Sequence, residues 1–153
     1  MNRNAAKTFL IAGGSGLVGE RLSSHLLQRG NTDKHLSRTP RTRDDGVQVF
    51  KWDIPDGFVD PAALENVDIV VHLAGAEIMD ERWTPARKKV LVDSRVDSLR
   101  LLRNVVTEVG AEIETLVSSS AQGYYEPNQG RELHEDDPGR SRVHGTTLCC
   151  LGN

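Results

Sequence analysis

Four glycines near the start of the chain have the spacing of a loop that binds phosphate. Gly14, Gly16 and Gly19 form G-x-G-x-x-G, and Gly13 adds an overlapping G-x-x-G-x-x-G. They follow the apolar run at residues 8–11 and lead into an amphipathic helix. Such a turn offers unpaired N–H groups and a positive dipole end to a dinucleotide pyrophosphate, although a glycine-rich turn that binds nothing is the alternative. The predicted contacts are Gly13, Gly14, Ser15, Gly16, Leu17, Val18 and Gly19.

The side chain at the end of the second strand selects between NAD and NADP in a site of this kind. An acidic residue accepts hydrogen bonds from the ribose hydroxyls of NAD, whereas a basic residue pairs with the 2′-phosphate of NADP. We place this strand at residues 32–37, so that Ser37 and Arg38 stand at its end. Arg38 therefore favours NADP over NAD, with Arg41 or Arg43 as helper. An ordinary loop cation is the alternative for Arg38.

Asp33 is anomalous in the same strand. It lies about twenty residues past Gly13, where a counting rule expects an acidic NAD-binding residue, but it falls inside the strand and we reject that role. Asp33, Lys34 and His35 occupy positions that a buried parallel strand normally fills with valine or isoleucine. A charge there is costly unless it is paired or neutralised, so Asp33, together with the tail described below, suggests a decaying gene.

Short apolar runs alternate with helical stretches, which predicts a parallel sheet of βαβ units. Val18, Leu22 and Leu26 recur every fourth residue and should form the buried stripe of the first helix, which Gly30 ends. The expected strands lie at residues 8–11, 32–37, 47–50, 67–73 and 116–120, the helices at 16–29 and 84–110, and a short helix within 57–66. We predict a Rossmann-type, doubly wound α/β sheet of order 3-2-1-4-5, with the pyrophosphate between strands one and four.

Residues after the third and fourth strands complete the predicted crevice. Asp53 would accept a hydrogen bond from the adenine amino group, or is a surface turn residue. Leu73, Ala74 and Gly75 would let the cofactor ribose approach the backbone, or pack tightly at a strand end. His72 is expected to be a buried structural histidine.

Composition limits the functional classes. The chain has 153 residues, 37% hydrophobic and 27% charged, and a formal net charge of −3, which argues against nucleic-acid or membrane partners. Its two cysteines, Cys149 and Cys150, are adjacent, so we expect no disulfide framework and a reducing cytoplasm. His134 and His144 are isolated, and we predict no metal site.

Several further segments resemble the extended short-chain dehydrogenase/reductases of the NAD(P)-dependent epimerase family, in the subfamily labelled as sugar-nucleotide epimerases or cell-division inhibitors. The matching segments are 13–19, 36–38, 70–77, 82–84, 94–95, 120–125 and 135–138. The resemblance covers residues 7–138, the N-terminal half of such a protein, without the strands and substrate-binding part that complete it. It implies a dinucleotide cofactor, with Arg82 as a candidate contact for an anionic substrate and Trp83 in packing.

The resemblance gives a less complete catalytic set. Ser120 matches the residue that holds the substrate hydroxyl, and Tyr124 is a candidate proton donor, although capping and wall roles are the respective alternatives. The superfamily's Tyr-x-x-x-Lys pair, expected about twenty-five residues past Ser120 by that resemblance, is missing from the sequence.

The final segment does not fit the family. We divide the chain into a nucleotide-binding domain at residues 1–138 and a tail at 139–153. Codons compatible with the tail, read from the second nucleotide, encode Phe-Thr-Ala-Gln-Leu-Cys-Val-Ala-Trp-Glu, a pattern typical of the family's next helix. We therefore hypothesise that the tail is a frameshift product.

Three functions follow from this reading. The first is an NADP-binding protein, ancestrally an oxidoreductase or epimerase acting on a small or sugar-nucleotide substrate. A non-catalytic NADP-binding or sensor protein and an inactive truncated product are the alternatives.

Overall fold

The computed structural model describes residues 5–41, 43–78, 80–119, 130, 132–134 and 136–137. The strands are β1 Thr8–Ala12, β2 Thr32–Ser37, β3 Gln48–Asp53, β4 Phe58–Val59, β5 Ile69–His72 and β6 Thr115–Ser118. The helices are α1 Leu17–Gln28, α2 Pro85–Val109 and the short 3-10 helix η1 Pro61–Leu64. The predicted catalytic residues Ser120 and Tyr124, and the tail at 139–153, lie outside the described residues.

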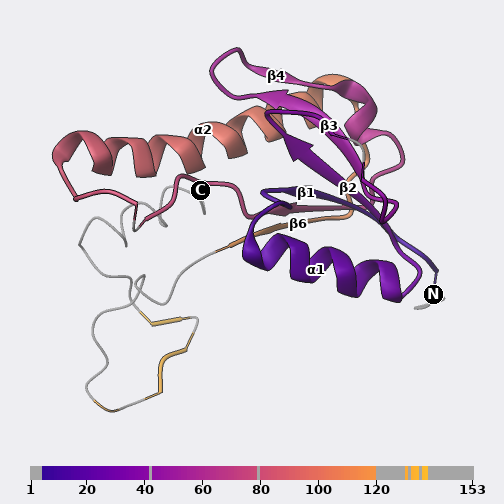
Figure 1. Cartoon of the computed structure of the whole chain (residues 1–153), viewed down its shortest axis with the longest axis horizontal. Helices are drawn as coiled ribbons and strands as arrows, with labels where there is room; N and C mark the ends of the chain where they lie inside the picture. The colour runs from indigo at the N-terminus through magenta and orange to yellow at the C-terminus, as the bar shows by residue number, and fades with distance from the viewer. Residues whose placement is uncertain are drawn as a thin grey trace.

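The sheet has the order β4-β3-β2-β1-β5-β6, and all its neighbours are parallel except β3 and β4. The five predicted strands are β3, β2, β1, β5 and β6 in this order, which confirms the doubly wound fold. Helix α1 covers one face and α2 crosses the other (Figure 1). Sequence periodicity missed β4, whose two residues pair Trp52 with Val59 and Asp53 with Phe58, because so short a strand carries no repeat.

The apolar core is divided unequally between the two faces. On the α2 face, Leu10, Val70 and Leu102 belong to the larger cluster. On the α1 face, the buried apolar cluster is limited to Ile11, Leu26 and Val71, with partly buried neighbours such as Leu22. Because strand residues alternate between faces, β1 contributes to both clusters.

One member of the predicted helix stripe is wrong. Val18 is 64% exposed, whereas Leu26 is buried and Leu22 packs against it. Val18 lies in the first turn of α1, whose buried residues are Gly19, Ser23 and Leu26, so the helical repeat extends one turn further than the burial does. The predicted helix end is confirmed, because Gly30 adopts a φ of +77° and its N–H donates to the Leu27 carbonyl.

Buried polar side chains complete the α1 face where apolar ones are scarce. Asp33 and His35 are 0% and 2% exposed and face Ser23 of α1, which is 1% exposed. His35 Nε2 lies 2.7 Å from Ser23 Oγ and 3.1 Å from Asp33 Oδ2. Pairing therefore accommodates the charge that the sequence identified as anomalous, although Asp33 Oδ1 has no hydrogen-bond partner.

On the opposite face of β2, Lys34 is buried as well. Its ammonium donates to the Ala62 and Glu65 carbonyls, at 3.2 and 2.8 Å, and lies 5.1 Å from the centre of the Phe50 ring. Burial lowers the pKa of Lys34. The polar second strand is thus built into the fold by specific partners on both faces.

Helix α2 has clear signals at both ends. The Thr84 side chain accepts a hydrogen bond from the Arg87 N–H, Pro85 opens the helix, and Gly110 ends it with a φ of +64°. The helix is continuous from Pro85 to Val109, and it supports the loop after β5 through Ser94. None of the helices within the described ranges has the length and apolarity needed to cross a membrane.

Candidate functional site

The glycine turn joins β1 to α1 at the carboxyl edge of the sheet. Gly13 has a φ of +87°, and a Cβ on it would lie 2.8 Å from the Ala74 nitrogen. A Cβ on Gly19 would lie 2.6 Å from the Gly13 carbonyl oxygen. Both distances are too short for a real side chain, so the turn, α1 and the segment after β5 approach as closely as glycine allows.

Gly16 differs from the other glycines of this turn. The nearest atom to a Cβ there would be the Gly13 carbonyl oxygen, at 3.4 Å, which is an ordinary contact. Its φ of −82° and ψ of 170° are extended and open to any residue. The folded chain itself leaves room for a side chain at this position.

The first turn of α1 is open to solvent. Gly16 is the N-cap and provides no side-chain hydrogen bond to the helix. Leu17 is 92% exposed, and Val18 lies beside it with most of its side chain exposed. An uncapped helix start with free N–H groups and an apolar rim can receive a phosphate and the flat groups attached to it.

The segment after β5 lies against the glycine turn at the carboxyl edge. The Leu73 N–H donates to the Ala12 carbonyl at 2.8 Å, and the Ala76 N–H donates to Ser94 Oγ at 3.0 Å. A Cβ on Gly75 would meet the guanidinium carbon of Arg95 at 2.8 Å. Gly75 therefore packs tightly against Arg95, which is the alternative to cofactor contact that the sequence left open.

His72 and Arg95 lie at the same edge. His72 is 1% exposed, and its Nε2 lies 2.8 Å from Ser98 Oγ, as expected for a structural histidine. Burial lowers the pKa of His72, and the positive charge of Arg95 lowers it further. Burial also lowers the pKa of Arg95, which donates to the Leu91 carbonyl.

The end of β2 carries the predicted cofactor-selecting residues. The Ser37 hydroxyl accepts a hydrogen bond from the Thr39 N–H at 3.2 Å. Arg38 follows it and is exposed, with no acidic partner in the described part of the chain. Both stand at the carboxyl edge, on the side of β1 that faces away from β5.

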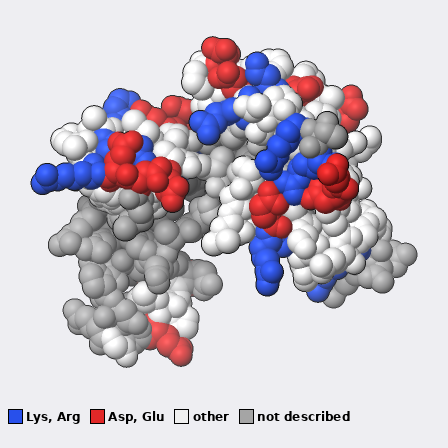
Figure 2. Space-filling model, viewed as in Figure 1, with Lys and Arg blue, Asp and Glu red and all other residues white. Residues whose placement is uncertain are grey.

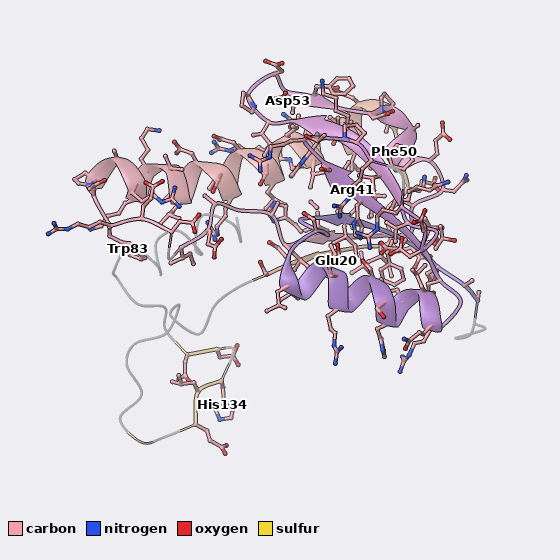
Figure 3. All side chains as sticks on the ribbon, viewed as in Figure 1. Glu20, Arg41, Phe50, Asp53, Trp83 and His134 are labelled. Atoms are coloured by element: carbon pink, nitrogen blue, oxygen red, sulfur yellow. The ribbon has the colours of Figure 1, made fainter. Side chains whose placement is uncertain are left out.

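A cluster of charges connects the loop after β2 to the start of α1. Arg43 donates to both carboxylate oxygens of Glu20, at 2.7 and 2.8 Å, and to Asp45. Arg41 lies 3.5 Å from Glu20. Figure 3 labels Glu20 and Arg41, and Figure 2 shows acidic and basic side chains interleaved over this part of the surface.

Hydrogen bonding governs the protonation of this cluster. The bonds from Arg43 lower the pKa of Glu20 and lower that of Asp45 to about 2, and the two carboxylates raise the pKa of Arg43. All three groups are charged at neutral pH.

Asp53 and Trp83, which Figure 3 labels, each make a local hydrogen bond. Asp53 Oδ1 accepts a hydrogen bond from the Asp56 N–H at 3.3 Å, as a turn residue does, and its adenine contact stays a prediction. Trp83 donates its indole N–H to the Ile78 carbonyl at 3.0 Å. Neighbouring Arg82 is exposed.

A cavity of about 760 Å³ lies away from this edge. Thr8, Asp68 and Glu112 are among the residues that line it, and they stand at the amino ends of β1, β5 and β6. It is therefore separate from the glycine turn at the carboxyl edge. No group of metal-ligating side chains is found in the described ranges.

Sequence reasoning missed three contacts of the site. Glu20 binds Arg43 from the loop after β2, and its position in the first turn of a helix does not indicate that partner, because the helix dipole by itself favours an acid there. His35 packs where a Cβ on Gly14 would be, 2.4 Å from its Nδ1, and no local pattern indicates that contact. Arg95 contacts Gly75 from a helix twenty residues away in the sequence.

Comparison with known proteins agrees with this geometry. The profile of the NAD dependent epimerase/dehydratase family matches residues 9–145. The chain belongs to this family. An epimerase family protein of Mycobacterium bovis is 36% identical over 127 residues, which cover 83% of this chain and 40% of that protein. A mouse epimerase family protein is 30% identical over 132 residues, covering 85% of this chain and 42% of its own length.

Solved structures give the same fold. A crystal structure of a human epimerase family protein with NADPH has a TM-score of 0.78 and 26% identity, over 95% of this chain and 47% of that one. The structure of MoeE5 in complex with UDP-glucuronic acid and NAD has a TM-score of 0.76 at 23% identity, a likeness of fold. The chain thus spans less than half the length of these relatives.

Proposed function

We propose that the chain binds NADP at the glycine turn. The observation that carries the proposal is the open space beside Gly16. The fold itself leaves room for a side chain at this position, whereas a phosphate bound there would clash with one. Leu17, Val18 and the N–H groups around them would hold the pyrophosphate. Ser37 and Arg38 would face the adenosine ribose, with Asp53 near adenine and Leu73, Ala74 and Gly75 beside the second ribose. A membership in a nucleotide-dependent family supports this assignment.

The preference for NADP rests on Arg38. An exposed guanidinium without an acidic partner keeps its charge available to a 2′-phosphate. The human relative of this fold, 26% identical, was crystallised with NADPH. NAD lacks the phosphate and would leave Arg38 without a ligand.

Isothermal titration of the chain with NADPH and NADH tests the proposal. We expect NADPH to bind at least tenfold more tightly, because a charge-assisted contact contributes more than about 1.4 kcal/mol. Arg38→Ala should remove most of this difference, whereas Arg103→Ala, which deletes an exposed charge on α2, should not change it. Tighter binding of NADH would refute the role of Arg38, and binding of neither nucleotide would refute the proposed function.

The reaction we propose is oxidoreduction or epimerisation of a small or sugar-nucleotide substrate. The nicotinamide of the cofactor, when bound, supplies hydride-transfer chemistry. Ser120 is proposed to hold a substrate hydroxyl and Tyr124 to move its proton. Turnover by this chain of UDP-sugars and simple carbonyl compounds, with loss in Ser120→Ala and Tyr124→Phe, would support these roles.

We also propose a cytoplasmic location, since the two adjacent cysteines suit a reducing compartment, and cell fractionation would test it.

A second candidate is a non-catalytic NADP-binding protein. The sequence favours it in one respect, because Tyr124 and Tyr125 are followed four residues later by Asn128 and Gln129 rather than lysine. Saturable NADPH binding without turnover of any substrate in the panel would favour this candidate over the enzyme.

A further inference from the structure

An acid directly follows the glycine turn, where its negative charge should repel a bound pyrophosphate. Glu20 lies in the first turn of α1, one helical turn from Gly16, and its side chain is 41% exposed. The helix N-terminus stabilises a carboxylate, but a carboxylate there also repels a phosphate that binds at the same place. Binding of a phosphorylated ligand therefore requires that Glu20 be neutralised.

Arg43 is engaged by two carboxylates, those of Glu20 and Asp45. Its side chain is 13% exposed. Nη1 and Nη2 bind the two oxygens of Glu20, while Nε and Nη2 bind Asp45. Each nitrogen of the guanidinium is thus committed to a carboxylate, and Arg43 fastens the loop after β2 to α1.

Arg41 is held much more loosely. It is 55% exposed, and its single contact with Glu20 is 3.5 Å long, outside the range of a good charged hydrogen bond. It stands three residues after Arg38 in the same loop. A long, exposed side chain of this kind can exchange a weak partner for a stronger one at little cost.

We infer that Arg41, and not Arg43, is the second cation for the adenosine 2′-phosphate, and that Glu20 competes with the phosphate for it. In the empty protein Glu20 shares Arg41 and Arg43. When a 2′-phosphate binds, with a charge of about −1.5 to −2, Arg41 moves to it and Glu20 keeps Arg43, which it shares with Asp45. The inference rests on the proposed function and specifies how that site selects its cofactor.

The direct test compares dissociation constants of NADPH and NADH for single variants at constant salt. Arg41→Ala should weaken NADPH about tenfold, since a charged contact is lost, and leave NADH within about twofold. The probes 2′,5′-ADP and 5′-AMP should show the same difference. Arg103→Ala is the control for loss of a distant charge.

A double-variant cycle distinguishes competition by Glu20 from direct binding by Arg43. Arg43→Ala leaves Glu20 with Arg41 alone, so NADPH binding should weaken about tenfold. Glu20→Gln removes the competitor and should tighten NADPH about threefold. The combination of Glu20→Gln with Arg43→Ala should bind NADPH within about twofold of Glu20→Gln, which a merely structural role of Arg43 would not produce. Circular dichroism melting of each variant checks that the fold is kept.

Three results overturn the inference. Equal loss of NADPH and NADH in Arg41→Ala would mean that Arg41 does not recognise the 2′-phosphate. An unrescued loss in the Arg43 and Glu20 double variant would mean that Arg43 binds the ligand itself. If the unmodified chain binds neither nucleotide, the proposed function fails first; if it prefers NADPH and Arg41→Ala changes nothing, only the inference fails.

Discussion

Alanine substitutions at Gly16 and Gly19 should separate cofactor binding from folding. The two changes add the same methyl group to the same turn. At Gly19 the new Cβ would lie 2.6 Å from the Gly13 oxygen and the Gly14 Cα, both of them backbone atoms that cannot rotate away. At Gly16 the closest approach is 3.4 Å, and the backbone already has an extended conformation that alanine adopts freely.

The structure sets the size of each effect. Overpacking at Gly19 should cost about 1–3 kcal/mol and lower the Tm by about 3–9 °C. At Gly16, alanine caps a helix less well than glycine but also restricts the unfolded chain, and these effects nearly cancel to within about 0.5 kcal/mol. The Gly16 methyl would instead stand where the pyrophosphate must approach, so NADPH affinity should fall at least tenfold, or about 1.4 kcal/mol.

Thermal melting and NADPH titration of both variants provide the assay. The expected pattern is normal stability with lost binding for Gly16→Ala, and lost stability for Gly19→Ala. If Gly16→Ala melts several degrees lower, the space beside Gly16 does not accommodate a methyl group in solution. If Gly16→Ala is stable and binds NADPH normally, the turn does not contact the cofactor and the proposed site is wrong.

Other predictions concern the polar groups inside the fold. His35→Leu should destabilise the chain by about 3–5 kcal/mol in urea unfolding, because Asp33 loses its partner. Adding Asp33→Val to this variant should recover at least about 2 kcal/mol. A double variant as unstable as the single one would show that the pair is not coupled. The pKa of His72 is lowered in the folded state, so below pH 6.5 the unfolded state binds a proton that the folded state does not. The free energy of unfolding should therefore be at its full value above pH 6.5. It should fall as the pH drops towards the folded pKa, by at most about 1.4 kcal/mol per pH unit. His72→Gln should lose this dependence between pH 7.5 and 5.5, and an unchanged slope would assign it to another group. Ser94→Ala should cost about 1 kcal/mol by leaving the Ala76 N–H unpaired, whereas Ser24→Ala on the exposed side of α1 should cost less, and equal effects would contradict the anchoring role of Ser94.

The fold was predictable because its signals are local. Apolar runs, the glycine turn and the helix ends at Gly30 and Gly110 depend on neighbouring residues and on repeats of two or about 3.6. They identified five strands in the correct order and both long helices. The burial of Val18 was predicted wrongly because periodicity gives the face of a helix but not how far along the helix that face is covered.

The polar strand β2 shows a second limit of sequence reasoning. Asp33 was rightly recognised as a charge that needs a partner, and it was interpreted as a sign of decay. The partner is His35, which is held by Ser23 from a separate helix. Whether a buried charge is tolerated depends on groups brought together by folding, so the strand's own residues could not decide it.

By itself, the sequence determined the strand–turn–helix at Gly13–Gly19 and the cation Arg38 after β2, because both follow from chain-local chemistry. Only the tertiary structure decided what surrounds them. It showed that Gly19 is required by the fold while Gly16 leaves space, and that Arg43 is committed to Glu20 and Asp45 while Arg41 is nearly free. Those distinctions depend on distances between α1, the loop after β2 and the end of β5, and such distances are set by packing rather than by spacing along the chain.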